Sequence, residues 1–336
     1  MPDPTMRAVC QDTAGGPEVL RLVETARPEP GRGEILVRVH AAGVNPADWK
    51  TRARGVFPDG GPLPFVLGWD VSGVVAAVGD GVTVFRPGDA VYGMPCFPHP
   101  AGAYAEYVAA PARHFAPRPQ GLDHIRAAGL PLAGLTAWQA LVDTADVRPG
   151  QRVLVHAAAG GVGHLAVQIA KARGAYVIGT ASAAKHELLR ELGADEVVDH
   201  RTQDVSRAVR DADVVLDPIG GANWARSLRC LRRGGTLVSL LPLTDAFPAA
   251  EAAEAGVEAV FMLVEPDRQG LLEISRLVAS GALRVLVDAV LPWESVAEAH
   301  RLGEQGRTTG KIVLSVADQG PSGGSGRTRG AWHRDL

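Results

Sequence analysis

The pattern of hydrophobic positions divides the 336-residue chain into three regions. As far as about Leu122 the apolar stretches are short and are separated by Gly and Pro turns, which is typical of a small barrel-like β domain. Glu34–Val44 alternates before it turns to small residues, Val71–Gly79 has the pattern of a buried strand, and Phe85–Gly93 places a Pro-Gly-Asp turn before a strand. The pattern predicts a β domain over residues 1–122.

Residues 123–281 have a different pattern, in which strand-like and helix-like stretches alternate as a parallel sheet requires. The predicted strands are Val153–Ala157, Tyr176–Thr180, Glu196–Val198, Val214–Asp217, Thr236–Leu241 and Glu258–Val264. Leu271–Val278 is apolar at helical spacing. Six strands with connecting helices match a complete doubly wound α/β sheet.

Strand-like character returns after Gly281, in Leu283–Trp293 and Gly310–Val316, with a predicted helix at about Glu294–Glu304. We expect these strands to rejoin the first domain, which then consists of residues 1–122 and 282–317 around an inserted domain at 123–281. Residues 318–336 are rich in Gly and Ser, and we predict a disordered tail.

The segment Val153–Ser182 has the form of a dinucleotide-binding βαβ unit: strand, glycine turn, helix and second strand. Ala158 stands at the first glycine of the G-x-G-x-x-G pattern. Small residues allow the backbone to approach a pyrophosphate, and the amides at the helix start face it. The predicted cofactor contacts in this turn are Ala159, Gly160, Gly161, Val162 and Gly163. The alternative is a glycine-rich turn without a ligand.

The end of the second strand indicates which cofactor binds. NAD enzymes place a carboxylate here for the ribose hydroxyl, but Thr180–Lys185 contains none. Ser182 can hydrogen-bond a 2′-phosphate and Lys185 can neutralise it, which favours NADPH over NADH. Alternatively, Ser182 caps the next helix and Lys185 is only solvated, and capping and phosphate binding can coexist.

Composition narrows the function classes. The formal net charge of −3 gives no support to a nucleic-acid surface, and no apolar run approaches the roughly 18–20 residues of a membrane span. The N-terminus lacks a signal-peptide pattern. Cys10, Cys96 and Cys230 are scattered, so neither a disulfide framework nor a zinc ribbon is expected. These features predict a cytoplasmic protein.

Several local motifs together resemble the medium-chain dehydrogenase/reductase superfamily, and within it the zinc-free quinone oxidoreductase and enone reductase branch. The motifs are GVNPADWK (Gly43–Lys50), LGWDVSGVV (Leu67–Val75), GAYAEYV (Gly102–Val108), LPLAGLTAWQAL (Leu130–Leu141), AAAGGVG (Ala157–Gly163) and GRTTGKIVL (Gly306–Leu314). The resemblance covers about residues 6–317. It implies a split GroES-like β-barrel catalytic domain, an inserted Rossmann NADPH-binding domain, and a homodimer.

The resemblance also bears on metal binding. Zinc-dependent members carry a Cys where this chain has Asn45, Gly-His-Glu where it has Gly68-Trp69-Asp70, and a second Cys near Ala133. These replacements remove the thiolate and imidazole ligands that zinc prefers, so no metal is expected. A zinc site built from other residues, such as some of the ten scattered histidines, is the alternative.

Without a Lewis acid, the easier reaction is hydride delivery from NADPH to an electron-poor acceptor, a quinone or an α,β-unsaturated carbonyl compound. The resemblance implies that Asn45 lies near the nicotinamide and the substrate carbonyl. Lys50 is either a hydrogen-bond donor to the substrate or cofactor, or a surface lysine. The remaining cofactor contacts that the resemblance implies are Thr136, Leu240, Leu241, Phe261, Met262, Leu263 and Lys311. The proton donor is not assigned.

Three alternatives stay open. An enoyl-thioester reductase of polyketide or fatty-acid metabolism performs the same chemistry on a carrier-bound chain, and Arg52 and Arg54 are candidates for a basic rim that holds the carrier arm. A nucleotide-binding protein without turnover belongs to a different class. A zinc dehydrogenase is the third.

Overall fold

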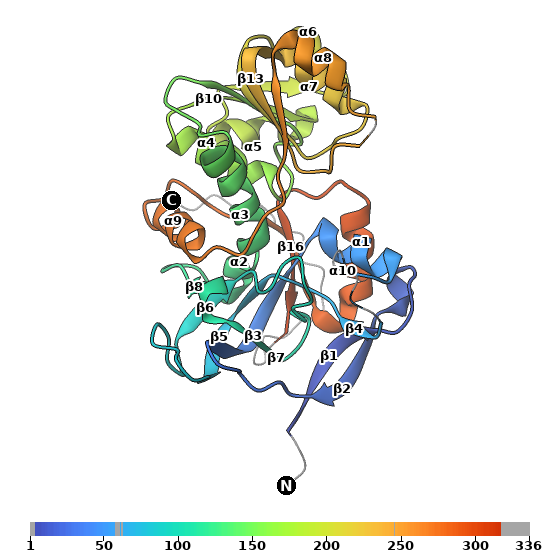
Figure 1. Ribbon diagram of the computed structural model, residues 1–336, viewed down its shortest axis with the longest axis vertical. Coiled ribbons are helices and arrows are strands. Elements are labelled where there is room, and N and C mark those ends of the chain that lie inside the picture. The colour runs from blue at the N-terminus through green and yellow to red at the C-terminus, as the bar shows by residue number, and fades with distance from the viewer. Residues whose placement is uncertain (1–3, 58–60, 62, 245, 317–336) are drawn as a thin grey trace. The chain divides into compact units, whose positions relative to one another are not determined.

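The computed structural model describes residues 4–57, 61, 63–244 and 246–316, which belong to two units (Figure 1). Unit 1 comprises residues 1–133, 265–279 and 285–336, and unit 2 comprises residues 134–264 and 280–284. The predicted tail at 318–336 lies outside the described residues. Helix α9 (Arg268–Ala279) belongs to unit 1 although it lies within the predicted cofactor domain, and the predicted domain limits stay a prediction.

Unit 1 is built on a seven-stranded sheet in the order β15-β16-β3-β5-β6-β8, with β7 also paired to β3, and on a three-stranded sheet β2-β1-β4. The strands are β1 (Thr5–Gln11), β2 (Arg21–Ala26), β3 (Glu34–Val44), β4 (Phe65–Val66), β5 (Val71–Val78), β6 (Ala90–Gly93), β7 (Tyr107–Pro111), β8 (Phe115–Pro117), β15 (Val287–Pro292) and β16 (Lys311–Ser315). β16 pairs antiparallel with β3, with Ile312 opposite Val44. Strands from the two ends of the chain therefore share one sheet, as the sequence predicts.

Short helices surround these sheets. They are α1 (Pro46–Arg54), α2 (His124–Ala128), α9, α10 (Val296–Glu304) and the 3₁₀ turns Pro17–Val19, Ala112–His114 and Trp293–Ser295, while α3 (Pro131–Trp138) begins in unit 1 and ends in unit 2. α1 starts directly after β3 because Asn45 and Asp48 form a capping box and Pro46 occupies the first turn. It ends at Gly55, whose φ of 67° suits a left-handed cap.

Unit 2 contains the six predicted strands, all parallel, in the order β11-β10-β9-β12-β13-β14. They are β9 (Arg152–Val155), β10 (Tyr176–Ala181), β11 (Glu196–Asp199), β12 (Ala212–Asp217), β13 (Leu231–Ser239) and β14 (Glu258–Phe261). The helices are α4 (Gly163–Ala172), α5 (His186–Glu191), α6 (Val205–Ala208), α7 (Asn223–Cys230) and α8 (Ala249–Ala255), with a π-helical turn at Gln139–Thr144 and a 3₁₀ turn at Ala183–Lys185. The strand order reverses between β9 and β12, so this is the topological switch point.

Three predicted strands of unit 2 end earlier than the sequence pattern suggests. The prediction Val153–Ala157 corresponds to β9, which ends at Val155. The prediction Thr236–Leu241 corresponds to β13, which ends at Ser239, because the Ser239 hydroxyl accepts a hydrogen bond from Leu241 N and forms a turn. The prediction that extends to Val264 corresponds to β14, which ends at Phe261. Apolar residues continue past the ends of β13 and β14, which explains why these two predictions are too long.

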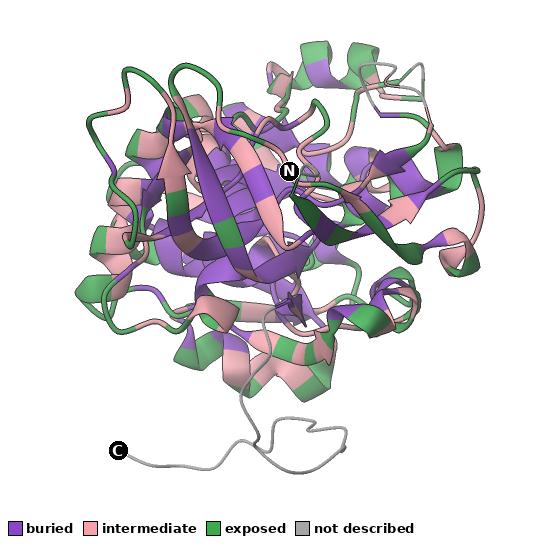
Figure 2. Cartoon of the chain, turned by 90° about the horizontal axis from the view of Figure 1, so that it is seen from below, coloured by how far each residue is buried: buried purple, intermediate pink, exposed green. Residues whose placement is uncertain are grey.

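Most buried residues lie in the central strands, while exposed residues lie in turns, on helices and in edge strands such as β2 (Figure 2). Val153, Leu154 and Val155 of β9 are completely buried, as the apolar run of a central parallel strand predicts. Among the described residues, no helix combines the length and the apolar character needed to cross a membrane.

Candidate functional site

In unit 2, most of the residues predicted to bind the cofactor follow the carboxyl ends of the parallel strands. Ala159–Gly163 follow β9, Ser182 and Lys185 follow β10, Leu240 and Leu241 follow β13, and Phe261–Leu263 end and follow β14. Carboxyl ends of parallel strands lie at one edge of a sheet, and ligands of doubly wound folds bind there, at the switch point. The arrangement therefore has the geometry of a dinucleotide site.

The turn after β9 is tightly packed, and its small residues would let the backbone approach a phosphate. Ala157 adopts a left-handed φ of 48°, and His164 N donates to Gly160 O at 3.1 Å. A Cβ atom on Gly163 would lie 2.3 Å from Ala157 O and 2.7 Å from Ala158 Cα, so only glycine fits at the start of α4. This close packing of helix against turn is the role of the last glycine in the fingerprint, and it fits a dinucleotide pyrophosphate.

The end of β10 presents Ser182 and Lys185, both partly exposed. Ser182 is the N-cap residue of the 3₁₀ turn Ala183–Lys185, but its side chain makes no capping hydrogen bond there. Of the two roles that the sequence allows for Ser182, side-chain capping is therefore not used. A serine hydroxyl and a lysine ammonium have the chemistry to bind a 2′-phosphate.

Large apolar side chains are exposed at the same edge of the sheet, after β12 and β14. Phe261 and Leu263 are 37 % and 49 % exposed, and Ile219, which follows β12, is 49 % exposed. Large apolar side chains at the end of a sheet suit a flat ring or an apolar substrate. Ile219 is missing from the sequence prediction, because its position after Asp217-Pro218 carries no motif. Thr136 lies on α3 and is buried.

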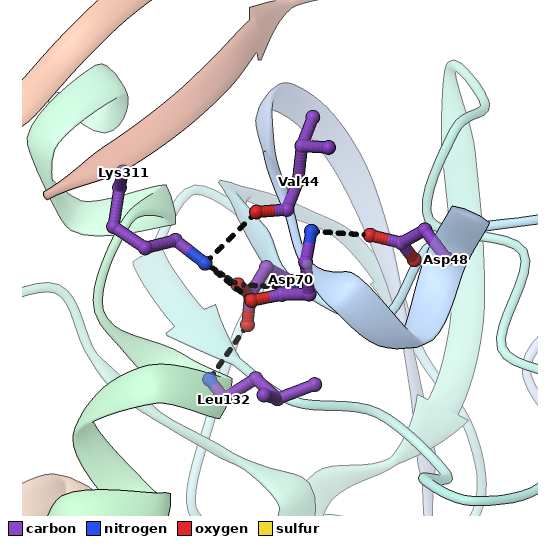
Figure 3. A network of polar contacts seen from close by, with 6 residues as sticks. Val44, Asp48, Asp70, Leu132 and Lys311 are labelled. Carbon is purple, nitrogen blue, oxygen red and sulfur yellow. Dashed lines mark hydrogen bonds and ion pairs between the residues drawn. The ribbon is translucent and has the colours of Figure 1, made fainter. Parts of the chain in front are cut away.

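In unit 1, Asn45 and Lys311 meet in a buried polar network (Figure 3). Lys311 Nζ donates to Val44 O at 3.1 Å and to Asn45 Oδ1, and it lies 3.3 Å from Asp70 Oδ2. These three protein oxygens match the three hydrogens of the ammonium group. Lys311 is predicted to contact the cofactor, and the structure adds that its charge is held by Asp70.

The other groups of the network fix the Asn45 amide and the Asp70 carboxylate. Asn45 Nδ2 donates to Asp70 Oδ2 at 2.8 Å, and Asp70 Oδ1 accepts from Leu132 N at 2.7 Å. Asn45 is 1 % exposed, and Asp70 is completely buried. The amide plane of Asn45 is thus held from both sides, with its oxygen facing a cation and its nitrogen facing an anion.

Asp48 supports Asn45 from the first turn of α1. Its Oδ2 atom accepts from Asn45 N at 2.6 Å, and the Tyr104 hydroxyl faces the same carboxyl group. Burial raises the pKa of Asp48 to about 7, which is partly offset by the Asn45 N–H and Tyr104 hydrogen bonds. Burial, with the nearby Asp48 charge, also raises the pKa of Tyr104.

A second set of hydrogen-bonded side chains begins at Tyr104. Tyr104 Oη lies 3.5 Å from His300 Nε2, and Arg52 donates to His300 Nδ1 at 3.0 Å and to Glu304 Oε1 at 2.5 Å. Burial, together with the Arg52 charge, lowers the pKa of His300 to about 3. Arg52 is only 2 % exposed, so the prediction that it forms part of a basic rim is wrong, because its guanidinium is committed inside unit 1. Arg54 is exposed.

Lys50 does not join either network. It lies on α1, and its surface is exposed. Partial desolvation of its ammonium group, and after it the Arg54 charge, lowers the pKa of Lys50. The sequence also gives no site role to Asp70 or Asp48. A signal was present for Asp70, since a carboxylate in the apolar stretch Trp69–Val71 needs a buried partner.

Zinc does not fit the positions that hold it in zinc-dependent relatives. Asn45 offers an amide, Trp69 donates its indole N–H to His99 O at 2.8 Å, and both oxygens of Asp70 already accept hydrogen bonds. Within residues 4–57, 61, 63–244 and 246–316, no three His, Cys, Asp or Glu side chains form a group able to hold a metal ion.

Comparisons with known proteins agree with this fold. Two family models match: the alcohol dehydrogenase GroES-like domain over residues 31–120, and the zinc-binding dehydrogenase domain over residues 192–314. The chain is 38 % identical to a quinone oxidoreductase from Coxiella burnetii of known structure, with a TM-score of 0.87 over 94 % of this chain and 100 % of that one. A mycobacterial protein solved with NADPH is 33 % identical, with a TM-score of 0.83 over 93 % of this chain and 100 % of that one.

Among curated proteins, the chain is 40 % identical to a pikromycin polyketide synthase component of Streptomyces venezuelae over 89 % of this chain, which spans only 8 % of that protein. It is 36 % identical to a 2-haloacrylate reductase of a Burkholderia species, over 89 % of this chain and 96 % of that protein. It is 33 % identical to human quinone oxidoreductase over 92 % of this chain and 97 % of that protein. The chain therefore belongs to the medium-chain dehydrogenase/reductase superfamily and is an oxidoreductase related to its quinone oxidoreductase branch.

Proposed function

We propose that the protein transfers hydride from NADPH to a quinone or an α,β-unsaturated carbonyl compound without a metal ion. The observation that carries the proposal is the Lys311–Asn45–Asp70 network, because Asn45 and Asp70, which stand at positions of the zinc-site motifs of zinc-dependent relatives, bind each other and Lys311 instead. Acceptors of this kind need no Lewis acid, because hydride addition gives a delocalised hydroquinone anion or enolate. The balance is one hydride from NADPH and one proton from the medium.

Unit 2 supplies the NADPH site in this proposal. The turn closed by Gly163 takes the pyrophosphate, and Ser182 and Lys185 take the 2′-phosphate. Bound NADPH supplies the hydride, and the protein orients it and excludes water. Support for the phosphorylated cofactor comes from the absence of a carboxylate in Thr180–Lys185 and from the mycobacterial relative solved with NADPH.

Asn45 has the chemistry to orient an acceptor. Its Nδ2 atom carries two hydrogens, of which Asp70 accepts one. We assign the second hydrogen to the carbonyl oxygen of the acceptor, where it stabilises the charge that develops on hydride addition. Lys311 and Asp70 hold the amide in one orientation, so they are positioning residues for Asn45.

An acceptor screen tests the proposal. NADPH oxidation is followed by its absorbance with 1,4-benzoquinone, a simple enone and a crotonyl thioester, with NADH in parallel. We expect turnover with the quinone or the enone and a clear preference for NADPH. Equal efficiency with NADH would contradict the roles of Ser182 and Lys185, and NADPH binding without turnover of any acceptor would favour a binding protein.

The second candidate is an enoyl-thioester reductase that acts on a carrier-bound chain. The specific support is the 40 % identity to a polyketide synthase component. With Arg52 buried, the basic rim that this function would use is reduced to Arg54. A kcat/KM for the crotonyl thioester far above that for a free enone would select this candidate, and Arg54→Ala should then lower it.

A further inference from the structure

Four buried side chains in unit 2 form a hydrogen-bonded chain across the carboxyl edge of the sheet. Thr180 Oγ1 lies 3.3 Å from His156 Nδ1, and His156 Nε2 lies 3.1 Å from Ser227 Oγ. Ser227 Oγ in turn lies 2.8 Å from Asp217 Oδ2. All four residues are at most 2 % exposed. They come from the ends of β9, β10 and β12 and from α7, so the chain spans the switch point.

The chemistry of the groups fixes the direction of every hydrogen bond. The Asp217 carboxylate only accepts, so the Ser227 hydroxyl must donate to it and must accept from His156 Nε2–H. His156 Nδ1 is then an acceptor and receives the Thr180 hydroxyl hydrogen. Burial lowers the pKa of His156, which keeps the ring neutral, as this pattern requires. Asn223 Nδ2 also donates to Asp217 Oδ2 at 3.0 Å and lies 3.4 Å from Ser227 Oγ, which agrees with these directions. The four side chains therefore have a single hydrogen-bonding arrangement.

Each end of the chain holds backbone of a cofactor loop. Thr180 Oγ1 accepts from Ala157 N at 3.2 Å, at the start of the glycine turn, and Thr180 precedes the loop of Ser182 by two residues. At the other end, Asp217 Oδ1 accepts from Ile219 N at 2.8 Å and Gly220 N at 2.9 Å.

The loop after β12 also touches a predicted nicotinamide contact. A Cβ atom on Gly220 would lie 2.8 Å from Leu241 Cδ1, so this loop packs directly against Leu241. The four hydrogen-bonded side chains thus connect the predicted pyrophosphate turn, the predicted 2′-phosphate loop and the loop beside Leu241.

We propose that His156, with Thr180, Ser227 and Asp217, is a positioning device that holds the three cofactor loops in register and thereby sets the affinity for NADPH. The inference rests on the proposed function, since it assigns these residues to the NADPH site. None of the four side chains needs to touch the cofactor. They act through the backbone amides that they hold.

Titration of NADPH by fluorescence tests this device in the purified protein. We expect His156→Leu, Thr180→Val and Ser227→Ala each to raise the Kd for NADPH on the order of tenfold, because each leaves a buried polar group unpaired. His156→Gln keeps one donor and one acceptor, so it should restore the Kd to within about threefold of wild type. The KM for the acceptor should stay unchanged in all variants.

Cys230→Ala is the matched control. Cys230 is a buried residue of α7, the helix that carries Ser227, but it lies outside the chain and contacts Val205 O and Arg226 O. Its removal should lower the thermal stability without changing the Kd. A wild-type Kd in His156→Leu, or an equal rise in Cys230→Ala, would overturn the inference while the proposed function stands. Absence of NADPH binding by the wild-type protein would overturn both.

Discussion

Lys311 Nζ lies 3.3 Å from Asp70 Oδ2 in the interior of unit 1, where neither side chain is more than 2 % exposed. Two opposite charges buried this deeply are tolerated only when they are paired and when hydrogen bonds satisfy their remaining groups. Both conditions hold, since Val44 O and Asn45 Oδ1 accept from the ammonium and Leu132 N donates to the carboxylate. The pair is therefore satisfied only while both partners are present, and loss of one partner should lower the free energy of unfolding.

Lys311→Met tests this cost. The substitution preserves the apolar stem but leaves the Asp70 charge unpaired, so the free energy of unfolding should fall by about 3–5 kcal/mol. Urea unfolding followed by circular dichroism measures the change. Adding Asp70→Asn to Lys311→Met removes the unpaired charge, and the double variant should be more stable than Lys311→Met alone.

The matched control for this prediction is Arg232→Ala. Arg232 Nε pairs with Asp213 Oδ1 at 2.5 Å, but the Arg232 side chain is 46 % exposed. Loss of such a surface pair should change the free energy of unfolding by about 1 kcal/mol or less. Equal losses for Lys311→Met and Arg232→Ala would show that the buried pair is not special.

Asn45 should matter for both turnover and folding. Asn45→Ala removes the amide that we assign to the acceptor and leaves the buried Lys311 and Asp70 side chains each without one hydrogen-bond partner, so kcat should fall on the order of 100-fold and the free energy of unfolding by about 1–3 kcal/mol. Asn45→Ser keeps a hydroxyl at the N-cap position of α1 but loses the amide contacts with Lys311 and Asp70, so its stability should recover only in part while its kcat stays low. Full activity of Asn45→Ala would refute the role of the amide. The Kd for NADPH should remain near wild type in both variants.

Local patterns were enough to predict most of the fold. The alternation in Glu34–Val44 matches β3, and the six apolar runs of unit 2 match its six parallel strands, because burial on one or two faces leaves a direct trace in the sequence. The close packing of the turn Ala157–Gly163 against α4 is predictable for a similar reason, since it requires small residues at set positions. Strand ends are less predictable, because a single hydroxyl such as that of Ser239 can stop a strand.

Contacts between residues that are far apart in the sequence leave no pattern in the local sequence. Lys311 and Asn45 are separated by 266 positions, and they meet only because the register of β16 on β3 places Ile312 opposite Val44. The sequence therefore indicates both residues through family resemblance but not their contact. The chain from Thr180 to Asp217 is hidden in the same way, since its four members look like ordinary residues at the ends of strands and in a helix.

Cofactor preference should depend on Lys185. Lys185→Glu replaces the charge that we assign to the 2′-phosphate by one that repels it, so the Kd for NADPH should rise on the order of 100-fold while the Kd for NADH changes little. Parallel fluorescence titrations with both cofactors measure the ratio. Lys171→Glu is the matched control, because Lys171 is a lysine of unit 2 to which we assign no cofactor contact, and its ammonium lies 2.7 Å from Asp195 Oδ1. A similar loss of NADPH affinity in Lys171→Glu would indicate a general charge effect instead.

Asp48 should make the stability depend on pH with an unusual sign. Its pKa is about 7 in the folded protein and near 3.8 in the unfolded chain, because burial disfavours the charge. Between these values the folded state binds one more proton than the unfolded state, so the free energy of unfolding falls as the pH rises through this window. The total from this residue is about 4 kcal/mol, fully lost above pH 7.

Asp48→Asn isolates this contribution. An asparagine can still accept the Asn45 N–H hydrogen bond, but it cannot ionise, so the variant should gain stability relative to wild type as the pH increases from 4 to 8. Subtraction of the two profiles is essential, because His300 acts in the opposite direction: its pKa is lowered to about 3 by burial, which makes the protein less stable as the pH falls below about 6.5. Urea unfolding at several pH values gives both profiles. A constant difference between Asp48→Asn and wild type across this range would show that Asp48 does not titrate in the folded state.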